Sequence, residues 1–119
     1  MIIKNYVIIS IMSNENFDIQ KNLNLALENI QKKNFSEAIN LYEKILKVVP
    51  NNFDANLNLG TIFAENNNLK KASELWTKAI EINPNVADAH NNLASLYMRL
   101  GENDKALTYI KNAIKINPK

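Results

Sequence analysis

Apolar residues in the last third of the chain follow two helical stripes separated by a polar turn. The first stripe has apolar positions three or four residues apart: Ala89, Leu93, Leu96, Tyr97 and Leu100. The second stripe has similar spacing: Ala106, Leu107, Ile110, Ala113 and Ile114. Side chains at this spacing lie on one face of an α-helix. Gly101, followed by the polar residues 102–104, predicts a break between them. This segment is therefore predicted to form a pair of helices.

The same pattern occurs three times, at a fixed interval along the chain. The interval is marked by three prolines, Pro50, Pro84 and Pro118. Proline ends a helix because its nitrogen carries no hydrogen. The same shift superposes three apolar columns: Leu25, Leu59 and Leu93; Ala38, Ala72 and Ala106; Tyr42, Trp76 and Ile110. The predicted helices span residues 19–32, 36–48, 53–66, 70–82, 87–100 and 104–116. The predicted caps of the three leading helices are Asp18, Asn52 and Asn85.

This pattern resembles the tetratricopeptide repeat, a helix–turn–helix unit of about 34 residues. The resemblance implies an all-α fold, a right-handed α-α superhelix (solenoid) of three helical hairpins. It divides the chain into an N-terminal extension, 1–18, and three repeats, 19–52, 53–86 and 87–119. The first repeat departs most from the family pattern, with Asn29 for the aromatic residue, Lys33 for the turn glycine and Ile45 for a small residue. End repeats are commonly atypical.

Small residues recur where the helices should approach each other closely. They occupy one column on the first helices, Ala26, Gly60 and Ala94, and one on the second helices, Ala38, Ala72 and Ala106. Larger side chains at these positions would push the helices apart. The column of Tyr42, Trp76 and Ile110 is expected to fill the space between helices. The predicted core contains Leu25, Tyr42, Leu59, Phe63, Trp76, Leu93, Tyr97 and Ala106.

The composition excludes several kinds of chemistry. The chain has no cysteine, which removes disulfides, thiol nucleophiles and cysteine-bound metals. Its single histidine, His90, has Val86 and Ala94 four residues to either side, so no pair of metal ligands forms on that helix. Glycine-rich phosphate loops and nucleophile motifs are missing from the sequence. We expect a chain that is not an enzyme and binds no cofactor or metal.

Charge and hydropathy bear on partners and location. The formal net charge is only +2, which argues against a specific nucleic-acid partner. The apolar run at residues 6–12 is too short for a stable membrane span, and we expect a cytoplasmic protein. Residues 1–12 fit an over-extended translation start better than a poor signal peptide or membrane anchor. The reason is that the polar segment beginning at Met12 leads directly into the first helix.

The resemblance implies a concave groove lined by the first helix of each repeat. The residues expected to face it are Gln20, Leu23, Asn24, Leu27, Gln31, Asp54, Leu57, Asn58, Thr61, Glu65, Asp88, Asn91, Asn92, Ser95 and Arg99. One column is uniform, Asn24, Asn58 and Asn92, and a row of amides can pair with the backbone of an extended peptide. The alternative is that the row reflects composition, because the chain contains 22 asparagines.

The groove residues also indicate which partners to expect. They carry three carboxylates against one arginine, so an acidic C-terminal tail is disfavoured. Family members that bind such tails use basic residues and asparagines, and of the five corresponding positions in this chain only Asn58 matches. A protein or peptide partner is therefore expected. The other interpretations are a repeat fragment of a larger enzyme, such as a glycosyltransferase or sulfotransferase, and a structural homo-oligomer.

The last helix suggests a second surface. Family arrays usually cover their final repeat with an additional polar-backed helix, and the printed sequence ends at Lys119. We therefore expect Leu107, Ile110 and Ile114 to form a partly exposed apolar strip beside Lys111 and Lys115. This strip predicts self-association, as a symmetric dimer.

Overall fold

The structure, a computed structural model, describes residues 19–119, which contain six helices and no strand. The predicted cap Asp18 and the N-terminal extension lie outside the described residues. The chain divides into two units, Met1–Pro50 and Asn51–Lys119, and each is considered by itself. The observed helices agree with the predicted ones to within one residue at almost every boundary.

The first unit is a pair of helices, residues 19–31 and α2 (Phe35–Val48). Its core contains Leu23, Ala26, Ala38, Leu41, Tyr42 and Ile45. Two predictions for the leading helix are wrong. Leu25, expected in the core, is 39% exposed, whereas Leu23, expected in the groove, is buried at 8%. Leu25 is exposed because no earlier hairpin within the described residues packs on its side of the helix.

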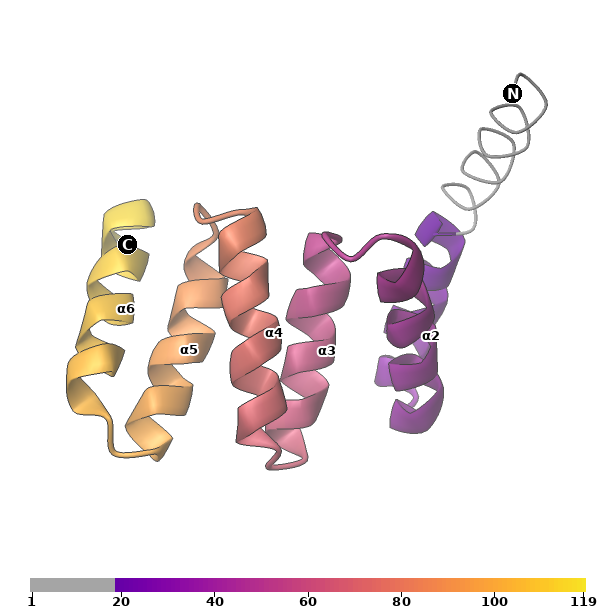
Figure 1. Ribbon diagram of the computed structural model, residues 1–119, viewed down its shortest axis with the longest axis horizontal. Coiled ribbons are helices and arrows are strands. Elements are labelled where there is room, and N and C mark those ends of the chain that lie inside the picture. Colours follow the sequence, from indigo (N-terminus) through magenta and orange to yellow (C-terminus); the bar gives the residue numbers. More distant parts are fainter. Residues whose placement is uncertain (1–18) are drawn as a thin grey trace, which may run out of the picture. The chain divides into compact units, whose positions relative to one another are not determined.

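The second unit contains two hairpins: α3 (Phe53–Glu65) with α4 (Leu69–Ile82), and α5 (Ala87–Arg99) with α6 (Asn103–Ile116). Figure 1 shows these four helices side by side in chain order, and α4 also packs against α5. The cluster that joins the hairpins contains Trp76 and Ala72 from α4 and Leu93 and Leu96 from α5. The described elements thus form an all-α repeat architecture, as predicted.

Buried positions follow the predicted columns closely. Ala26, Ala38, Ala72, Ala94 and Ala106 are each no more than 3% exposed, and Gly60 is buried as well. Of the predicted core, Tyr42, Leu59, Trp76 and Leu93 are buried, while Phe63 and Tyr97 are half-buried and pack against the cluster. Small side chains at the crossing points let the helices approach closely enough for the large ones to be covered.

The beginnings of the helices follow the prediction only in part. Asn52 caps α3, its Oδ1 accepting a hydrogen bond from the Ala55 backbone N–H at 2.9 Å. The prediction for Asn85 is wrong. The cap of α5 is Val86, the position equivalent to Asn52 in the repeat, and its side chain has no hydrogen-bond acceptor. An asparagine that was not foreseen, Asn68, caps α4 through the Lys71 backbone N–H at 3.4 Å. The second helix of each hairpin ends two residues before its proline, as expected.

Each hairpin turn uses the same backbone motif. Lys33, Asn67 and Gly101, at equivalent positions of the three repeats, all have positive φ, at 61°, 63° and 77°. The backbone N–H of each bonds the carbonyl three residues earlier, and the next N–H bonds the carbonyl five residues earlier. This pattern is the Schellman motif, which satisfies carbonyls at the end of a helix. It requires a left-handed residue at a fixed position, which glycine adopts most easily.

The turn position predicts a stabilising substitution. Lys33→Gly should raise the free energy of unfolding by about 0.5–1 kcal/mol, because a residue with a Cβ is strained in the left-handed region. Urea denaturation followed by circular dichroism measures the change. Lys33→Ala is the matched control, since it removes the same side chain and keeps the strain. An equal gain for both variants would show that the effect comes from the lysine side chain and not from the backbone.

Candidate peptide-binding surface

The candidate surface lies on the first helix of each hairpin. In the second unit, α3 and α5 carry Asn58 and Asn92 at equivalent positions, and both side chains are half-buried. Neither amide forms a hydrogen bond with another side chain or backbone group within residues 19–119. A half-buried amide that has no internal partner retains two donors and an acceptor for a ligand. These two side chains are the best-placed polar groups of the predicted groove.

The neighbouring predicted residues differ in how available they are. The Thr61 hydroxyl is engaged, donating to the Leu57 carbonyl oxygen at 3.0 Å. Leu57 itself is half-buried and packs against the core cluster, so it presents little surface to a ligand. Asn91 and Ser95 are exposed on α5. The uncharged polar groups that this surface offers are therefore mainly amides.

The charges on α3 and α5 are predominantly negative. Asp54, Glu65 and Asp88 are exposed, and none of them forms an ion pair with another residue of the described range. The one cation among the predicted residues, Arg99, donates from Nη2 to the Asn67 side-chain oxygen at 3.0 Å. Arg99 thus holds the end of α5 against the α3–α4 turn. Its charge is partly committed to this internal contact.

In the first unit, the predicted residues lie on the helix 19–31. Asn24, Leu27 and Gln31 are exposed, with Leu27 at 46%. The Gln20 side chain donates to Asn24 Oδ1 at 3.2 Å, so the acceptor of that amide is engaged while its donors remain. Asn24 therefore differs from its two counterparts in both exposure and bonding.

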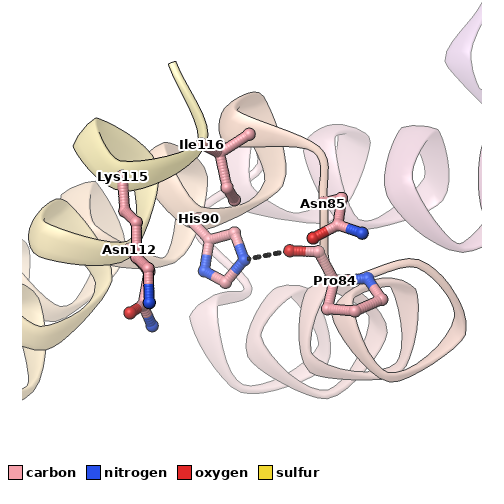
Figure 2. A pocket seen from close by; sticks show the side chains of 6 residues that line it. All are labelled: Pro84, Asn85, His90, Asn112, Lys115 and Ile116. Atoms are coloured by element: carbon pink, nitrogen blue, oxygen red, sulfur yellow. Dashed lines mark hydrogen bonds between the residues drawn. The ribbon is translucent and has the colours of Figure 1, made fainter. Parts of the chain in front are cut away.

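A separate pocket of about 640 Å³ lies between the α4–α5 loop and the end of α6. It is lined by Pro84, Asn85, His90, Asn112, Lys115 and Ile116 (Figure 2). His90 is 5% exposed, its Nε2 lies 2.8 Å from the Pro84 carbonyl oxygen, and its ring lies 5.9 Å from that of Tyr109. The sequence did not indicate this pocket, because its residues come from three segments with no shared motif.

The contact made by His90 assigns it a structural role. At the equivalent position of α3, Asn56 donates to the carbonyl oxygen of Asn52 at 2.8 Å. Both side chains therefore contact a backbone carbonyl at or just before the start of a leading helix. This contact does not replace the side-chain cap that Val86 lacks, because a cap accepts a hydrogen bond from a backbone N–H of the helix. The histidine is thus used in the connection between the two hairpins.

Two titratable groups of α6, Lys105 and Tyr109, have raised pKa values. Burial raises the pKa of Tyr109, and the neighbouring Tyr97, whose ring is stacked 5.7 Å away, adds to this. The hydrogen bond from Lys105 to Glu102, at 2.9 Å, raises the pKa of the exposed lysine. Within residues 19–119, no three histidine, aspartate or glutamate side chains gather where they could hold a metal ion. Across the same range, no helix has the length and apolar content needed to cross a membrane.

The sequence period, the paired helices and the repeated turn motif define a helical repeat protein. Models of the tetratricopeptide repeat match residues 29–76 and 87–119, and a model of the TPR repeat matches 60–101. The chain belongs to the tetratricopeptide repeat family. A comparison with curated proteins finds no match.

Solved structures of repeat proteins share this fold. A crystal structure of MamA superposes with a TM-score of 0.80 at 23% identity, covering 92% of this chain and 64% of that one. A second MamA structure gives 0.78 at 26% identity, covering 84% and 55%. The O-GlcNAc transferase mutant K341M of Thermobaculum terrenum gives 0.82 at 23% identity, covering 88% of this chain but only 20% of the transferase. The chain thus spans less than two thirds of each of these proteins.

Proposed function

We propose that this chain is a non-catalytic protein–protein interaction module that acts in the cytoplasm and binds an extended or helical peptide segment along the first helices of its repeats. Membership in the tetratricopeptide repeat family supports the interaction role. The observation that carries the choice of surface is the pair of half-buried amides, Asn58 and Asn92, which have no internal hydrogen-bond partner within residues 19–119.

The amide groups suit a peptide backbone in particular. Each carries an N–H₂ donor and a carbonyl acceptor, which match the alternating acceptors and donors of a main chain. Recognition through the main chain depends little on the peptide's side chains. Specificity then comes from the neighbouring residues, among them Asn91 and Ser95 of α5.

The charges favour one class of peptide over another. The exposed carboxylates Asp54, Glu65 and Asp88 stand against Arg99, whose guanidinium already bonds Asn67. A peptide that is neutral or basic gains favourable electrostatic interactions here, and an acidic tail is repelled. This supports a partner other than an acidic C-terminal tail.

The asparagine pair predicts a measurable loss of affinity. Peptides selected against the wild-type chain from a displayed library should bind the double variant Asn58→Ala/Asn92→Ala about 5- to 150-fold more weakly, because each lost hydrogen bond costs about 0.5–1.5 kcal/mol. Isothermal titration calorimetry measures the dissociation constants. The triple variant that adds Asn24→Ala tests the first repeat in the same way.

The control for this prediction removes the same number of amides elsewhere. Asn40 on α2 and Asn112 on α6 are exposed residues of second helices, and the variant Asn40→Ala/Asn112→Ala should bind as wild type does. Equal affinity of wild type and Asn58→Ala/Asn92→Ala for every selected peptide would contradict the proposed surface. Unchanged circular dichroism spectra show that the variants remain folded.

A second candidate is a repeat segment of a larger enzyme, such as a glycosyltransferase or sulfotransferase. The observation in its favour is the superposition on the Thermobaculum terrenum transferase at a TM-score of 0.82, over 20% of that protein. The length of the complete reading frame distinguishes the candidates directly. A catalytic domain encoded in frame after Lys119 would favour the enzyme, and an in-frame stop would favour the separate module.

A further inference from the structure

The outer face of α6 is unusually apolar for an exposed surface. Leu107 is 49% exposed and Ile114 is 57% exposed, with the half-buried Ile110 between them. Met98, at the end of α5, is 59% exposed beside them. Two shallow hollows of about 330 and 310 Å³ border this face, the first lined by Met98, Leu107 and Ile110 among others and the second by Ile114 and Asn117 among others. Contiguous exposed apolar groups of this kind mark interaction surfaces.

The molecule itself shows how such a face is covered. The equivalent positions of the preceding repeat lie on α4. They are Ser73, Trp76 and Ile80, which correspond to Leu107, Ile110 and Ile114. That face of α4 packs against α5, where Trp76 joins a cluster with Leu93 and Leu96. The face on α6 is more apolar than its covered counterpart, because Leu107 stands where α4 has a serine. It therefore has the composition of a buried surface.

A second copy stacked head to tail is a poor fit for this face. In α5, the buried residues that join the cluster with α4 are Leu93 and Leu96. The corresponding residues of the helix 19–31 are Leu25 and Glu28, both exposed. Covering α6 with that helix would bury a glutamate against apolar side chains, which is unfavourable. The surface of a second copy that suits the strip is α6 itself.

The order of residue types along the strip is nearly the same in both chain directions, so two antiparallel copies match each other. Along α6 the strip is Asn103, Leu107, Ile110, Ile114 and Asn117. In an antiparallel pair with a two-fold axis near Ile110, Leu107 of each copy meets Ile114 of the other, and the asparagines meet at both ends. Asp104 lies on the same flank as Lys111 and Lys115, which follow it by about two and three helical turns. In the antiparallel arrangement each Asp104 faces Lys115 of the other copy, while Lys111 lies near the two-fold axis beside its own counterpart. In a parallel pair this flank would face the opposite flank of the other helix, and Asp104 and Lys115 would not meet.

We propose that a second copy of this chain covers α6, forming a symmetric homodimer in which the two α6 helices are antiparallel. A two-fold interface of this kind uses the same patch on both subunits and closes after two copies. It buries the apolar strip without burying a charge. At one hollow, lined by Asp88 and Asn91 as well as Ile114 and Asn117, the strip adjoins the proposed peptide-binding surface. The dimer is therefore tested by mass and by cross-linking, two measurements that need no bound peptide and whose failure leaves the proposed function untouched.

The first test is the mass of the full chain in solution between 1 and 100 μM, by light scattering after size exclusion. Wild type should give twice the monomer mass, and Ile114→Lys should give the monomer mass with an unchanged circular dichroism spectrum. Val48→Lys is the matched control, because it places the same charge at another exposed aliphatic side chain (41%), outside both proposed surfaces, and should remain dimeric. A wild type that is monomeric at 100 μM, or an Ile114→Lys variant that is still a dimer, would overturn the proposal.

The second test uses the absence of cysteine from the chain. A chain carrying Asn103→Cys mixed with one carrying Asn117→Cys should form a disulfide-linked heterodimer under mild oxidation. Neither chain alone should cross-link, because in the antiparallel pair the two equivalent positions lie roughly 20 Å apart along the helices, about 14 residues at 1.5 Å each, well beyond the reach of a disulfide. Cross-linking of the Asn103→Cys chain with itself would indicate a parallel pair. That result, or no cross-link in the mixture, would overturn the proposed arrangement.

Discussion

Gly60→Ala should destabilise the protein by about 1–3 kcal/mol, although alanine is the better helix former. A Cβ at position 60 would lie 2.6 Å from both Cδ1 and Nε1 of the Trp76 indole and 3.3 Å from Leu75 Cβ. The indole cannot easily move away, because its Nε1 donates to the Leu57 carbonyl oxygen at 3.0 Å. The cost of overpacking and of the strained hydrogen bond exceeds the gain of up to about 1 kcal/mol in helix propensity. Urea denaturation followed by circular dichroism measures the loss.

The other repeats supply the control for this prediction. At the same two register positions the first repeat has Ala26 with Tyr42, both fully buried, and the third has Ala94 with Ile110. A smaller side chain at position 76 should therefore accept alanine at position 60. In the Trp76→Tyr background, Gly60→Ala should be neutral or stabilising, giving a coupling energy of about 1 kcal/mol or more. The same loss in both backgrounds would show that the indole does not require the glycine.

Ala72→Trp is expected to have an effect of similar size, about 1–3 kcal/mol or more. The side chain of Ala72 is 0% exposed and lies in the cluster that joins the two hairpins of the second unit, beside Trp76 and Leu93. A second indole there would separate α4 from α5 or force its neighbours out of their rotamers. The melting temperature and the urea midpoint should both fall.

Lys70→Trp provides the comparison for that substitution. Lys70 lies two residues earlier on the same helix and is exposed, so an indole there meets no packed neighbours and should leave stability within about 0.5 kcal/mol of wild type. If Ala72→Trp melted at the same temperature as Lys70→Trp, the small column would not be a packing requirement.

Both effects arise from small residues at close helix contacts: Gly60 packs against Trp76 within one hairpin, and Ala72 lies in the cluster between two hairpins. Within a hairpin, the repeat pairs one small residue with one large one. The repeat period identifies both columns, but it does not say how tightly a given pair is fitted. Gly60 with Trp76 is the most demanding of the three pairs, since the largest side chain lies against the residue without a Cβ. Substitutions at these positions are therefore best made in the small residue and the large residue of a pair together.

Much of the fold was determined by the sequence alone. The helix boundaries, the buried alanines and the left-handed turn at Gly101 all follow from local rules applied at a fixed period. Helical periodicity acts within a few residues, and each repeat supports the assignment of the others. Because the repeats support one another, the sequence also shows that Lys33 replaces the glycine expected at the turn, where the structure has a positive φ.

The tertiary structure decided which of the equivalent positions are covered and which polar groups are used. Leu25 and Leu93 occupy the same column, yet only Leu93 has a packed neighbour from a preceding hairpin within the described residues. His90 connects the first turn of α5 to the loop before it because its Nε2 reaches the Pro84 carbonyl oxygen, a contact that no spacing rule contains. The apolar face of α6 was legible in the sequence, but its exposure depends on what lies against it. Burial and hydrogen bonding between segments depend on which surfaces meet in space, and a residue's place in its own repeat does not specify that.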